Sequence, residues 1–332
     1  MAARSLLRVT ADDAEYRRLA AAEMDFWSKP HPFGLEALEK VESAGPAERY
    51  NNERLTGQPG VPWYEMIPRY GQVFRRGLVL GTSAMRVEAR ILETNPSLHL
   101  TFLDISPGAV ARRAEVLGAR FPGRVGTAVS DLNFVALEPE SYDLIVTSAT
   151  LHHVTNLEYV ADQINRALTG EGRFFLQDYV GEPRFQFSEE KRRVFTLLHD
   201  RELAATQPWR KASIVFDDAS DLSPFCGVRS HEVLSVLGTY LDPVEVRTAG
   251  ALLVALMRAH PTDLASIGTR SNAAWRAAFW LERRAYGLVG RLPPRNTLMP
   301  DRFLRTLGEM GDLLADAGLL VPGTAFGVYR KR

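Results

Sequence analysis

The stretch Leu78-Val-Leu-Gly-Thr-Ser-Ala-Met85 carries the clearest structural signal in the chain, because an apolar run passes through a glycine turn directly into an amphipathic window, Met85–Thr94. Further short apolar runs and helical windows alternate up to about Asp178. Strands that are apolar along their whole length and alternate with helices are typical of a parallel sheet covered on both faces. We therefore predict an α/β fold with a doubly wound sheet that begins at Leu78.

The sequence predicts further strands and helices on the C-terminal side of this turn and helical segments on its N-terminal side. Predicted strands are Leu78–Gly81, Leu98–Asp104, Arg124–Val129, Tyr142–Ser148, Arg173–Asp178, Pro243–Thr248 and Gly323–Arg330, and predicted helices are Met85–Thr94, Gly108–Arg120 and Leu157–Leu168. We expect an N-terminal helical cap over residues 1–75 and a ligand-binding core over residues 76–180. Residues 181–332 are expected to add helical insertions, which shape the substrate site, and the two strands that complete the sheet.

Composition excludes several classes of protein. The 332 residues include 40 basic and 40 acidic side chains, and this balance disfavours a dedicated nucleic-acid binder. The one cysteine, Cys226, argues against a disulfide framework and a cysteine-based zinc site. The longest aliphatic run, Ala251–Met257, is shorter than the ~20 residues of a transmembrane helix, and residues 1–18 lack the apolar segment of a signal peptide. We expect a cytoplasmic protein without a transmembrane segment.

Two carboxylates mark a candidate ligand site. In doubly wound sheets, ligands bind beyond the carboxyl ends of the strands. The turn Gly81–Met85 lies at such an end, and Asp104 follows 23 residues after Gly81, where an acidic side chain can accept hydrogen bonds from a ribose diol. Asp131 comes just after the next predicted strand, and its carboxylate with the adjacent backbone amide could hydrogen-bond to the edge of an adenine ring. The structural alternatives are an ordinary tight turn and, for Asp104, the N-cap of the next helix, a role that Ser106 could also fill.

Two downstream stretches add a family resemblance. Ser141-Tyr-Asp-Leu-Ile-Val-Thr-Ser-Ala-Thr-Leu-His-His-Val154 and Ile164-Asn-Arg-Ala-Leu-Thr-Gly-Glu-Gly-Arg173 follow the turn in order. Over residues 77–180 the chain resembles the class I S-adenosylmethionine-dependent methyltransferases, and within them a bacterial branch of small-molecule enzymes. The resemblance implies a Rossmann-like sheet of seven strands with the last antiparallel. It also implies S-adenosylmethionine as cofactor and O-methylation of a small molecule in sugar or natural-product biosynthesis.

The resemblance assigns the cofactor site residue by residue. Gly81 and Thr82 are expected to meet the methionine part, Asp104 the ribose, and Asp131 with Leu132 the adenine. The full set of expected cofactor-binding residues is Gly81, Thr82, Ser83, Asp104, Ile105, Asp131, Leu132 and Ser148.

The glycine-rich motif departs from the family pattern. The family usually has an acidic residue two positions before the first glycine and glycines at alternating positions after it, whereas this chain has Val79, Ser83 and Met85 there. This departure motivates an alternative, a protein of the same fold that does not methylate. Such a protein would catalyse a cyclisation or another rearrangement, or would serve as a silent binding partner.

Four residues at strand ends are candidates for catalysis. His152 and His153 follow the fourth strand, and either could act as general base because histidine ordinarily titrates near neutrality. Asp178 and Tyr179 end the fifth strand and could accept a proton from, or hydrogen-bond to, a hydroxyl substrate. The alternatives are packing or helix capping for the histidines and loop anchoring for Asp178 and Tyr179. No metal site is expected, because adjacent residues on a helix do not face one site.

The C-terminal third suggests partners. Asn272–Leu288 combines four aromatic residues with arginines, which fits a membrane-surface or dimer helix, or a helix packed on the sheet. Residues 265–310 carry eight arginines against three acidic residues. We expect a small-molecule substrate, which could be anionic, no nucleic acid, and a homodimer as one option.

Overall fold

The computed structural model describes six segments of the chain, residues 7–29, 46–70, 73–206, 214–217, 222–261 and 301–332. These residues belong to two compact units. The first unit spans Met1–Phe185, Ser220–Ala249 and Pro322–Arg332, and the second spans Gln186–Ala219 and Gly250–Val321.

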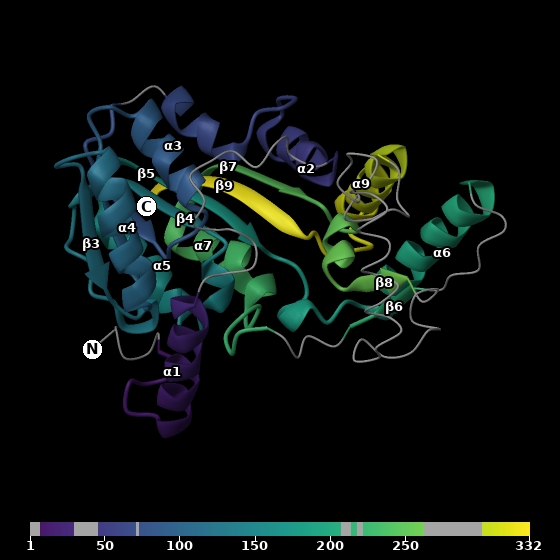
Figure 1. Cartoon of the computed structure of the whole chain (residues 1–332), viewed down its shortest axis with the longest axis horizontal. Coiled ribbons are helices and arrows are strands. Elements are labelled where there is room, and N and C mark those ends of the chain that lie inside the picture. Colours follow the sequence, from purple (N-terminus) through teal and green to yellow (C-terminus); the bar gives the residue numbers. More distant parts are fainter. Residues whose placement is uncertain (1–6, 30–45, 71–72, 207–213, 218–221, 262–300) are drawn as a thin grey trace, which may run out of the picture. The chain divides into compact units, whose positions relative to one another are not determined.

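The first unit contains a seven-stranded sheet with the order β3-β2-β1-β4-β5-β9-β7 (Figure 1). Its strands are β1 (Arg76–Leu80), β2 (His99–Asp104), β3 (Val125–Val129), β4 (Tyr142–Ser148), β5 (Leu168–Tyr179), β7 (Leu241–Ala249) and β9 (Thr324–Lys331). Strands β1 to β5 pair in parallel, and β9 runs antiparallel to both of its neighbours, β5 and β7. The predicted Rossmann-like sheet with an antiparallel last strand is therefore confirmed.

Two apolar layers cover the sheet. One layer contains side chains of α5 (Leu157–Ala167) and α7 (Val233–Tyr240), packed against strand residues such as Ile145 and Phe174. The other contains side chains of α3 (Met85–Thr94), α4 (Pro107–Arg120) and the 3-10 segment η2 (Trp63–Tyr70). Strands buried on both faces explain why the sequence shows continuous apolar runs instead of alternation.

The N-terminal residues divide between two places. Helix α1 (Ala14–Ser28) begins at the N-cap Asp13, whose side chain accepts a hydrogen bond from Tyr16 N, and it packs against α4. Helix α2 (Pro46–Thr56) instead packs against β7, and η2 packs against α3. Helix α1 also reaches the carboxyl edge of the sheet, where Tyr16 OH donates a hydrogen bond to Asp131 Oδ2.

The second unit is built from helices and a small sheet. The elements formed by its described residues are α6 (Glu189–Thr206), β6 (Ile214–Phe216), η7 (Leu253–Met257), β8 (Ala259–Pro261) and α9 (Asp301–Asp316), with β6 antiparallel to β8. Lys191 is fully buried, and its Nζ donates a hydrogen bond of 2.8 Å to Val321 O. This buried charge joins α6 to the end of the chain segment that follows α9.

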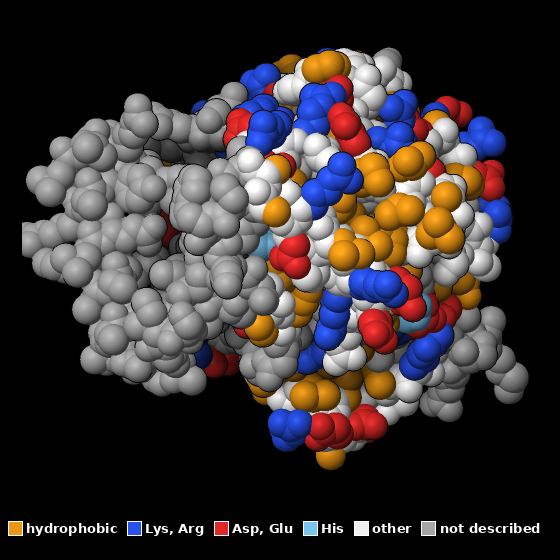
Figure 2. Space-filling view, turned by 90° about the vertical axis from the view of Figure 1, so that its right-hand side faces the viewer, with side chains coloured by type: hydrophobic (Ala, Val, Ile, Leu, Met, Phe, Trp, Pro, Cys, Tyr) orange, Lys and Arg blue, Asp and Glu red, His pale blue; other side chains and the backbone are white. Residues whose placement is uncertain are grey.

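The surface of the described residues is mixed. Figure 2 shows a face on which hydrophobic side chains lie among Lys, Arg, Asp and Glu side chains. In the described part of the chain, no helix has the length and apolar character needed to cross a bilayer. The aromatic segment Asn272–Leu288 and most of the basic region 265–310 lie outside the described residues.

Candidate active site

The turn after β1 requires glycine. Gly81 has a φ of +75°, and a Cβ built on it would lie 2.2 Å from Thr150 Cγ2. Its N–H donates to Leu103 O at 2.8 Å, so the turn is fixed to the end of β2. A positive φ and a neighbour this close leave room only for a residue without a side chain.

Asp104 organises the next part of the site. Its Oδ2 accepts hydrogen bonds from the backbone N–H and the hydroxyl of Thr82, both at 2.7 Å, and its Oδ1 accepts one from Ser106 N at 2.8 Å. Ser106 itself caps α4 by accepting from Ala109 N. A carboxylate has about four acceptor positions, so three bonds leave roughly one for a ligand hydroxyl.

A buried ion pair supports the other side of the turn. Ser83 N donates a hydrogen bond of 2.8 Å to Glu88 Oε1, and Arg113 Nε donates one of 2.9 Å to Glu88 Oε2. Arg113 also donates to Ser83 O. Val79 and Met85, in contrast, are buried in the apolar layer beneath α3. The loop is therefore held by a carboxylate from the following helix, at position 88 instead of position 79.

Helix α1 is attached to the third strand end. Tyr16 OH donates a hydrogen bond of 2.6 Å to Asp131 Oδ2, while Asn133 donates from its backbone and side chain to Asp131 Oδ1. Burial and the Asp131 carboxylate raise the pKa of Tyr16, so the phenol keeps its proton and remains a donor. The Tyr16 ring also stacks on Phe225 with ring centroids 5.4 Å apart.

These groups surround one cavity with about 820 Å³ of empty space, part of it open to solvent. The predicted residues that line it are Gly81, Thr82, Ser83, Asp104, Ile105, Asp131, Leu132 and His153. The predicted residues outside its lining are Ser148, His152, Asp178 and Tyr179. Ser148 Oγ donates instead to Gln177 Oε1 at 3.2 Å, within the β4–β5 pair.

His153 is the histidine at the cavity wall, and α1 supplies its partner. His153 Nδ1 lies 2.9 Å from Glu23 Oε1, and Glu23 also accepts hydrogen bonds from Trp27 Nε1, Ser223 Oγ and Phe225 N. Burial and the adjacent His152 lower the pKa of His153, but hydrogen bonds to Cys226 and Glu23 outweigh them, so the pKa lies above its ordinary value. Burial would raise the pKa of Glu23, yet its hydrogen bonds, led by that of His153, hold it below the usual range.

His152 and Asp178 form a second pair behind the cavity wall. The distance from His152 Nδ1 to Asp178 Oδ1 is 2.5 Å, and the fully buried Asp178 also accepts from the backbone N–H groups of Thr150, Leu151 and Tyr179. Asp178 therefore orients His152 and the turn that carries both histidines.

Tyr179 is held away from the cavity. Its hydroxyl donates to Glu182 O at 2.7 Å, and its ring stacks on Phe185 with centroids 4.0 Å apart. These contacts anchor the segment that follows β5.

Glu23, Trp27, Thr150 and Phe225 line the cavity but were not predicted. Glu23 and Phe225 lie far along the chain from the strand-end motifs, and one acidic residue on an amphipathic helix gives no local sign of a buried partner. The periodicity of α1 could have indicated only that Glu23 shares a helix face with Trp27, four residues later.

The comparisons with known proteins fit this geometry. Residues 78–174 match a family model described as a methyltransferase domain. Curated proteins include no sequence that matches the chain.

Two solved structures share the fold at low sequence identity. One is geranyl diphosphate C-methyltransferase from Streptomyces coelicolor A3(2), with a TM-score of 0.51, 12% identity, and coverage of 98% of this chain and 100% of that chain. The other is coclaurine N-methyltransferase, with a TM-score of 0.51, 11% identity, and coverage of 99% and 86% respectively.

The matched residues contain the end of β1, all of β2 to β4 and most of the candidate site, including the glycine turn, Asp104, Asp131 and both histidines. The sheet order and its antiparallel strand are those of the fold that the two structures share with this chain. Residues 78–174 thus match a methyltransferase domain, in a chain that has the fold of these two methyltransferases.

Proposed function

We propose that this chain transfers a methyl group from S-adenosylmethionine to an oxygen atom of a small-molecule acceptor. The observation that carries the proposal is the position of His153, which lines the same cavity as Asp104 and Asp131 and is hydrogen-bonded to the Glu23 carboxylate. A cofactor subsite and a proton acceptor thereby share one wall.

The residues present fit the cofactor. Asp104 and Asp131 each accept three hydrogen bonds from the protein, which leaves each carboxylate roughly one acceptor position for a ribose hydroxyl or an adenine amino group. Leu132 and Ile105 supply apolar surface beside them. The turn at Gly81 and Thr82 would hold the methionine part.

The chemistry divides between cofactor and protein. The sulfonium of S-adenosylmethionine supplies an electrophilic methyl group, so the protein has to position the acceptor in line with it and remove a proton. His153 Nε2 would take the proton from the acceptor hydroxyl as the new O–CH₃ bond forms. Glu23 would stabilise the resulting imidazolium through Nδ1, in the way that a buried carboxylate orients a catalytic histidine.

Basic side chains support an anionic acceptor. Lys29, Arg112 and Arg113 line the cavity together with the acidic residues described above. Arg113 is paired with Glu88, whereas Lys29 pairs with Asp25 at an exposed position where solvent screens the interaction. Lys29 could therefore exchange this carboxylate for one on a substrate. The sequence resemblance supports a place in sugar or natural-product biosynthesis.

The departures from the glycine motif count little in favour of a protein that does not methylate. Met85 is fully buried, Val79 is nearly so, and both belong to the apolar layer under α3. The loop itself keeps a carboxylate through Glu88.

The test combines binding with turnover. We expect calorimetry to show one molecule of S-adenosylmethionine or S-adenosylhomocysteine bound per chain, and mass spectrometry to show methylated product from a panel of hydroxylated acceptors. His153→Asn should reduce turnover by about 10²–10⁴-fold with little change in cofactor affinity. His99→Asn is the matched control and should leave turnover unchanged, because His99 lies at the end of β2 opposite to Asp104 and the cavity. Cofactor binding without product across the panel would favour the alternative, and absence of binding at millimolar concentration would refute the proposed function.

A further inference from the structure

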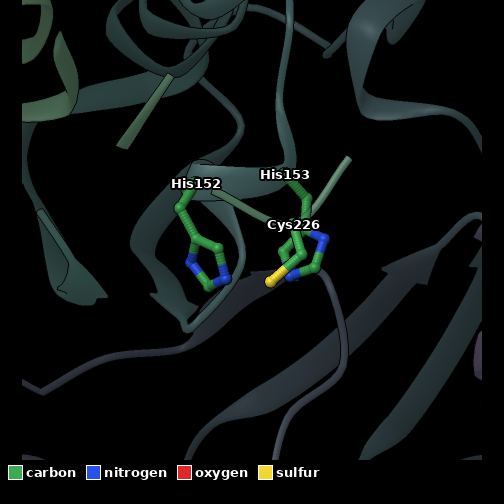
Figure 3. A group of neighbouring side chains, drawn as sticks. All are labelled: His152, His153 and Cys226. Atoms are coloured by element: carbon green, nitrogen blue, oxygen red, sulfur yellow. The ribbon is translucent and has the colours of Figure 1, made fainter. Parts of the chain in front are cut away.

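Three potential metal ligands converge beside the cavity. His152 and His153 lie on the 3-10 turn η4 (Leu151–His153), and Cys226 comes from the segment before η6 (Ser230–Glu232). One ligand atom of each residue lies within 4.8 Å of the other two. Figure 3 shows a nitrogen of each imidazole ring turned toward the Cys226 sulfur.

The tight turn explains why adjacent histidines can face one site. Their ring centroids are 4.2 Å apart, with the planes tilted by 44°. On a regular helix, the side chains of adjacent residues point in different directions, which is why no metal site was expected from the sequence. This rule does not hold here, because the two residues lie on a short 3-10 turn that ends at Val154.

Each histidine has its second nitrogen held by a carboxylate. His152 Nδ1 contacts Asp178 Oδ1 at 2.5 Å, and His153 Nδ1 contacts Glu23 Oε1 at 2.9 Å. If both Nδ1 atoms donate to these acceptors, both Nε2 atoms carry a lone pair. Histidines that bind metals almost always donate their other ring N–H to a carboxylate, a carbonyl or a water molecule. The cluster thus contains both the ligands and the groups that orient them.

The segment that carries Cys226 is fixed in place from two sides. Arg184 Nη1 donates to the carbonyls of Ser223, Pro224 and Cys226, at 3.3, 2.7 and 3.2 Å. Val228 N donates to His152 O at 3.1 Å, which joins the cysteine segment directly to the histidine turn. Ligands held in this way need little rearrangement to bind an ion.

We propose that His152 Nε2, His153 Nε2 and Cys226 Sγ bind one soft divalent cation of the Zn²⁺ class. Two imidazoles and a thiolate suit zinc, and three protein ligands with an open fourth position are typical of catalytic zinc sites. The thiolate, Asp178 and Glu23 supply negative charge to balance the cation. On binding, the Cys226 thiol releases its proton to solvent, so affinity rises with pH.

The site also suggests how an acceptor is activated, a step that rests on the proposed function. In the metal-free protein His153 Nε2 would accept the proton, as the proposed function states; a bound cation would use that lone pair and would take over the activation of the acceptor. An acceptor hydroxyl at the fourth position then loses its proton to solvent more readily, because the cation lowers its pKa. Of the three ligands, His153 is the one that lines the cavity in which the acceptor would bind.

Cobalt provides a direct test, because Cys226 is the only cysteine in the chain. We expect the full chain, freed of metal with a chelator, to bind one equivalent of Co²⁺. A near-ultraviolet thiolate-to-cobalt charge-transfer band should appear, and Zn²⁺ should displace the cobalt. Cys226→Ser should abolish the band and weaken binding by on the order of 100-fold or more, whereas His99→Asn should leave both unchanged. Glu23→Gln should weaken binding by about 10–100-fold while the band remains.

The outcomes separate the cation site from the methyltransferase. Failure to bind Co²⁺ or Zn²⁺ at tenfold excess, bound Co²⁺ without the band, or equal affinity in Cys226→Ser would each overturn the cation site. Calorimetry with S-adenosylmethionine on the same metal-free sample shows whether the cofactor site is intact. Cofactor binding without metal binding would support the proposed function and overturn the cation site. Metal binding without cofactor binding would support the cation site and refute the proposed function. Circular dichroism of each variant excludes misfolding as the cause.

Discussion

The Glu88 carboxylate accepts a hydrogen bond of 2.8 Å from the backbone N–H of Ser83, although the family motif would place the organising carboxylate before the glycine turn. Arg113 binds both residues, through Glu88 Oε2 and Ser83 O. The Glu88 and Arg113 side chains are only 1% and 3% exposed, so the pair is shielded from solvent and salt. Glu88, in the first turn of α3, therefore holds the loop after β1, whereas the family motif has its acidic residue on the strand before the loop.

This relationship predicts that Glu88→Gln weakens both the fold and cofactor binding. Removing one partner of a buried ion pair leaves the other charge uncompensated and costs about 3–5 kcal/mol of unfolding free energy. The loop should also loosen, and S-adenosylmethionine affinity should fall. Urea denaturation and calorimetry measure the two effects. Glu93→Gln, in the exposed pairs that Glu93 makes with Arg90 and Arg120, is the control and should cost less than about 1 kcal/mol. Equal effects of the two substitutions would argue against the role of Glu88.

Met85→Ala separates packing from cofactor binding. Met85 begins α3 and is fully buried in the apolar layer. Truncation should leave a cavity and reduce the unfolding free energy by about 2–5 kcal/mol. Cofactor affinity, measured well below the unfolding temperature, should stay within about threefold of the original value, a difference of roughly 0.6 kcal/mol. A variant with unchanged stability and altered affinity would mean that Met85 faces the ligand.

The contrast between these two positions shows what local sequence pattern can and cannot establish. The predicted helix Met85–Thr94 agrees with α3 residue for residue, because its apolar periodicity is local information. The same periodicity did not indicate that Glu88 would be buried, since its partner Arg113 lies 25 residues away on α4. Burial of a charged side chain depends on a partner that only the tertiary structure brings near.

Strand β5 shows the same limit at an element boundary. It was predicted as Arg173–Asp178 but begins at Leu168, because Tyr142 pairs with Leu168 and the register then shifts before Leu144 pairs with Arg173. Glycines such as those at 170 and 172 are typical of a helix end, and an irregularity in strand pairing has no local signal of its own. Prediction of the site from the sequence was limited for the same reason. Glu23 and Cys226 lie beside His153 in the fold, but they are 130 and 73 residues away from it along the chain.

Two neighbouring substitutions test the role of Asp104. Asp104→Asn should lower S-adenosylmethionine affinity by about 10–100-fold, because a hydrogen bond to a charged group contributes roughly 1.5–3 kcal/mol. Ser106→Ala removes the N-cap of α4, whose side chain accepts from Ala109 N, and should cost about 1 kcal/mol of stability with little effect on affinity. Calorimetry and thermal unfolding of both variants give the comparison. If Asp104→Asn lost stability and kept its affinity, Asp104 would be a structural residue of the turn.

The Arg229 guanidinium predicts an acid-sensitive contact away from the cavity. Arg229 Nη1 and Nη2 each donate 2.7 Å hydrogen bonds to the two carboxylate oxygens of Glu158. This pairing outweighs partial burial and lowers the pKa of Glu158 from 4.5 to about 2. Because the pKa is lower in the folded state, the contact stabilises the fold fully above the ordinary pKa and loses this effect as the pH falls from about 4.5 toward 2. The difference in urea midpoint between the native chain and Glu158→Gln should therefore shrink between about pH 6 and about pH 3. Glu15→Gln, in an exposed pair with Arg18, should show almost no difference at the upper end of this range. A Glu158→Gln difference that stays constant across the range would show that the lost contact is not one between charges.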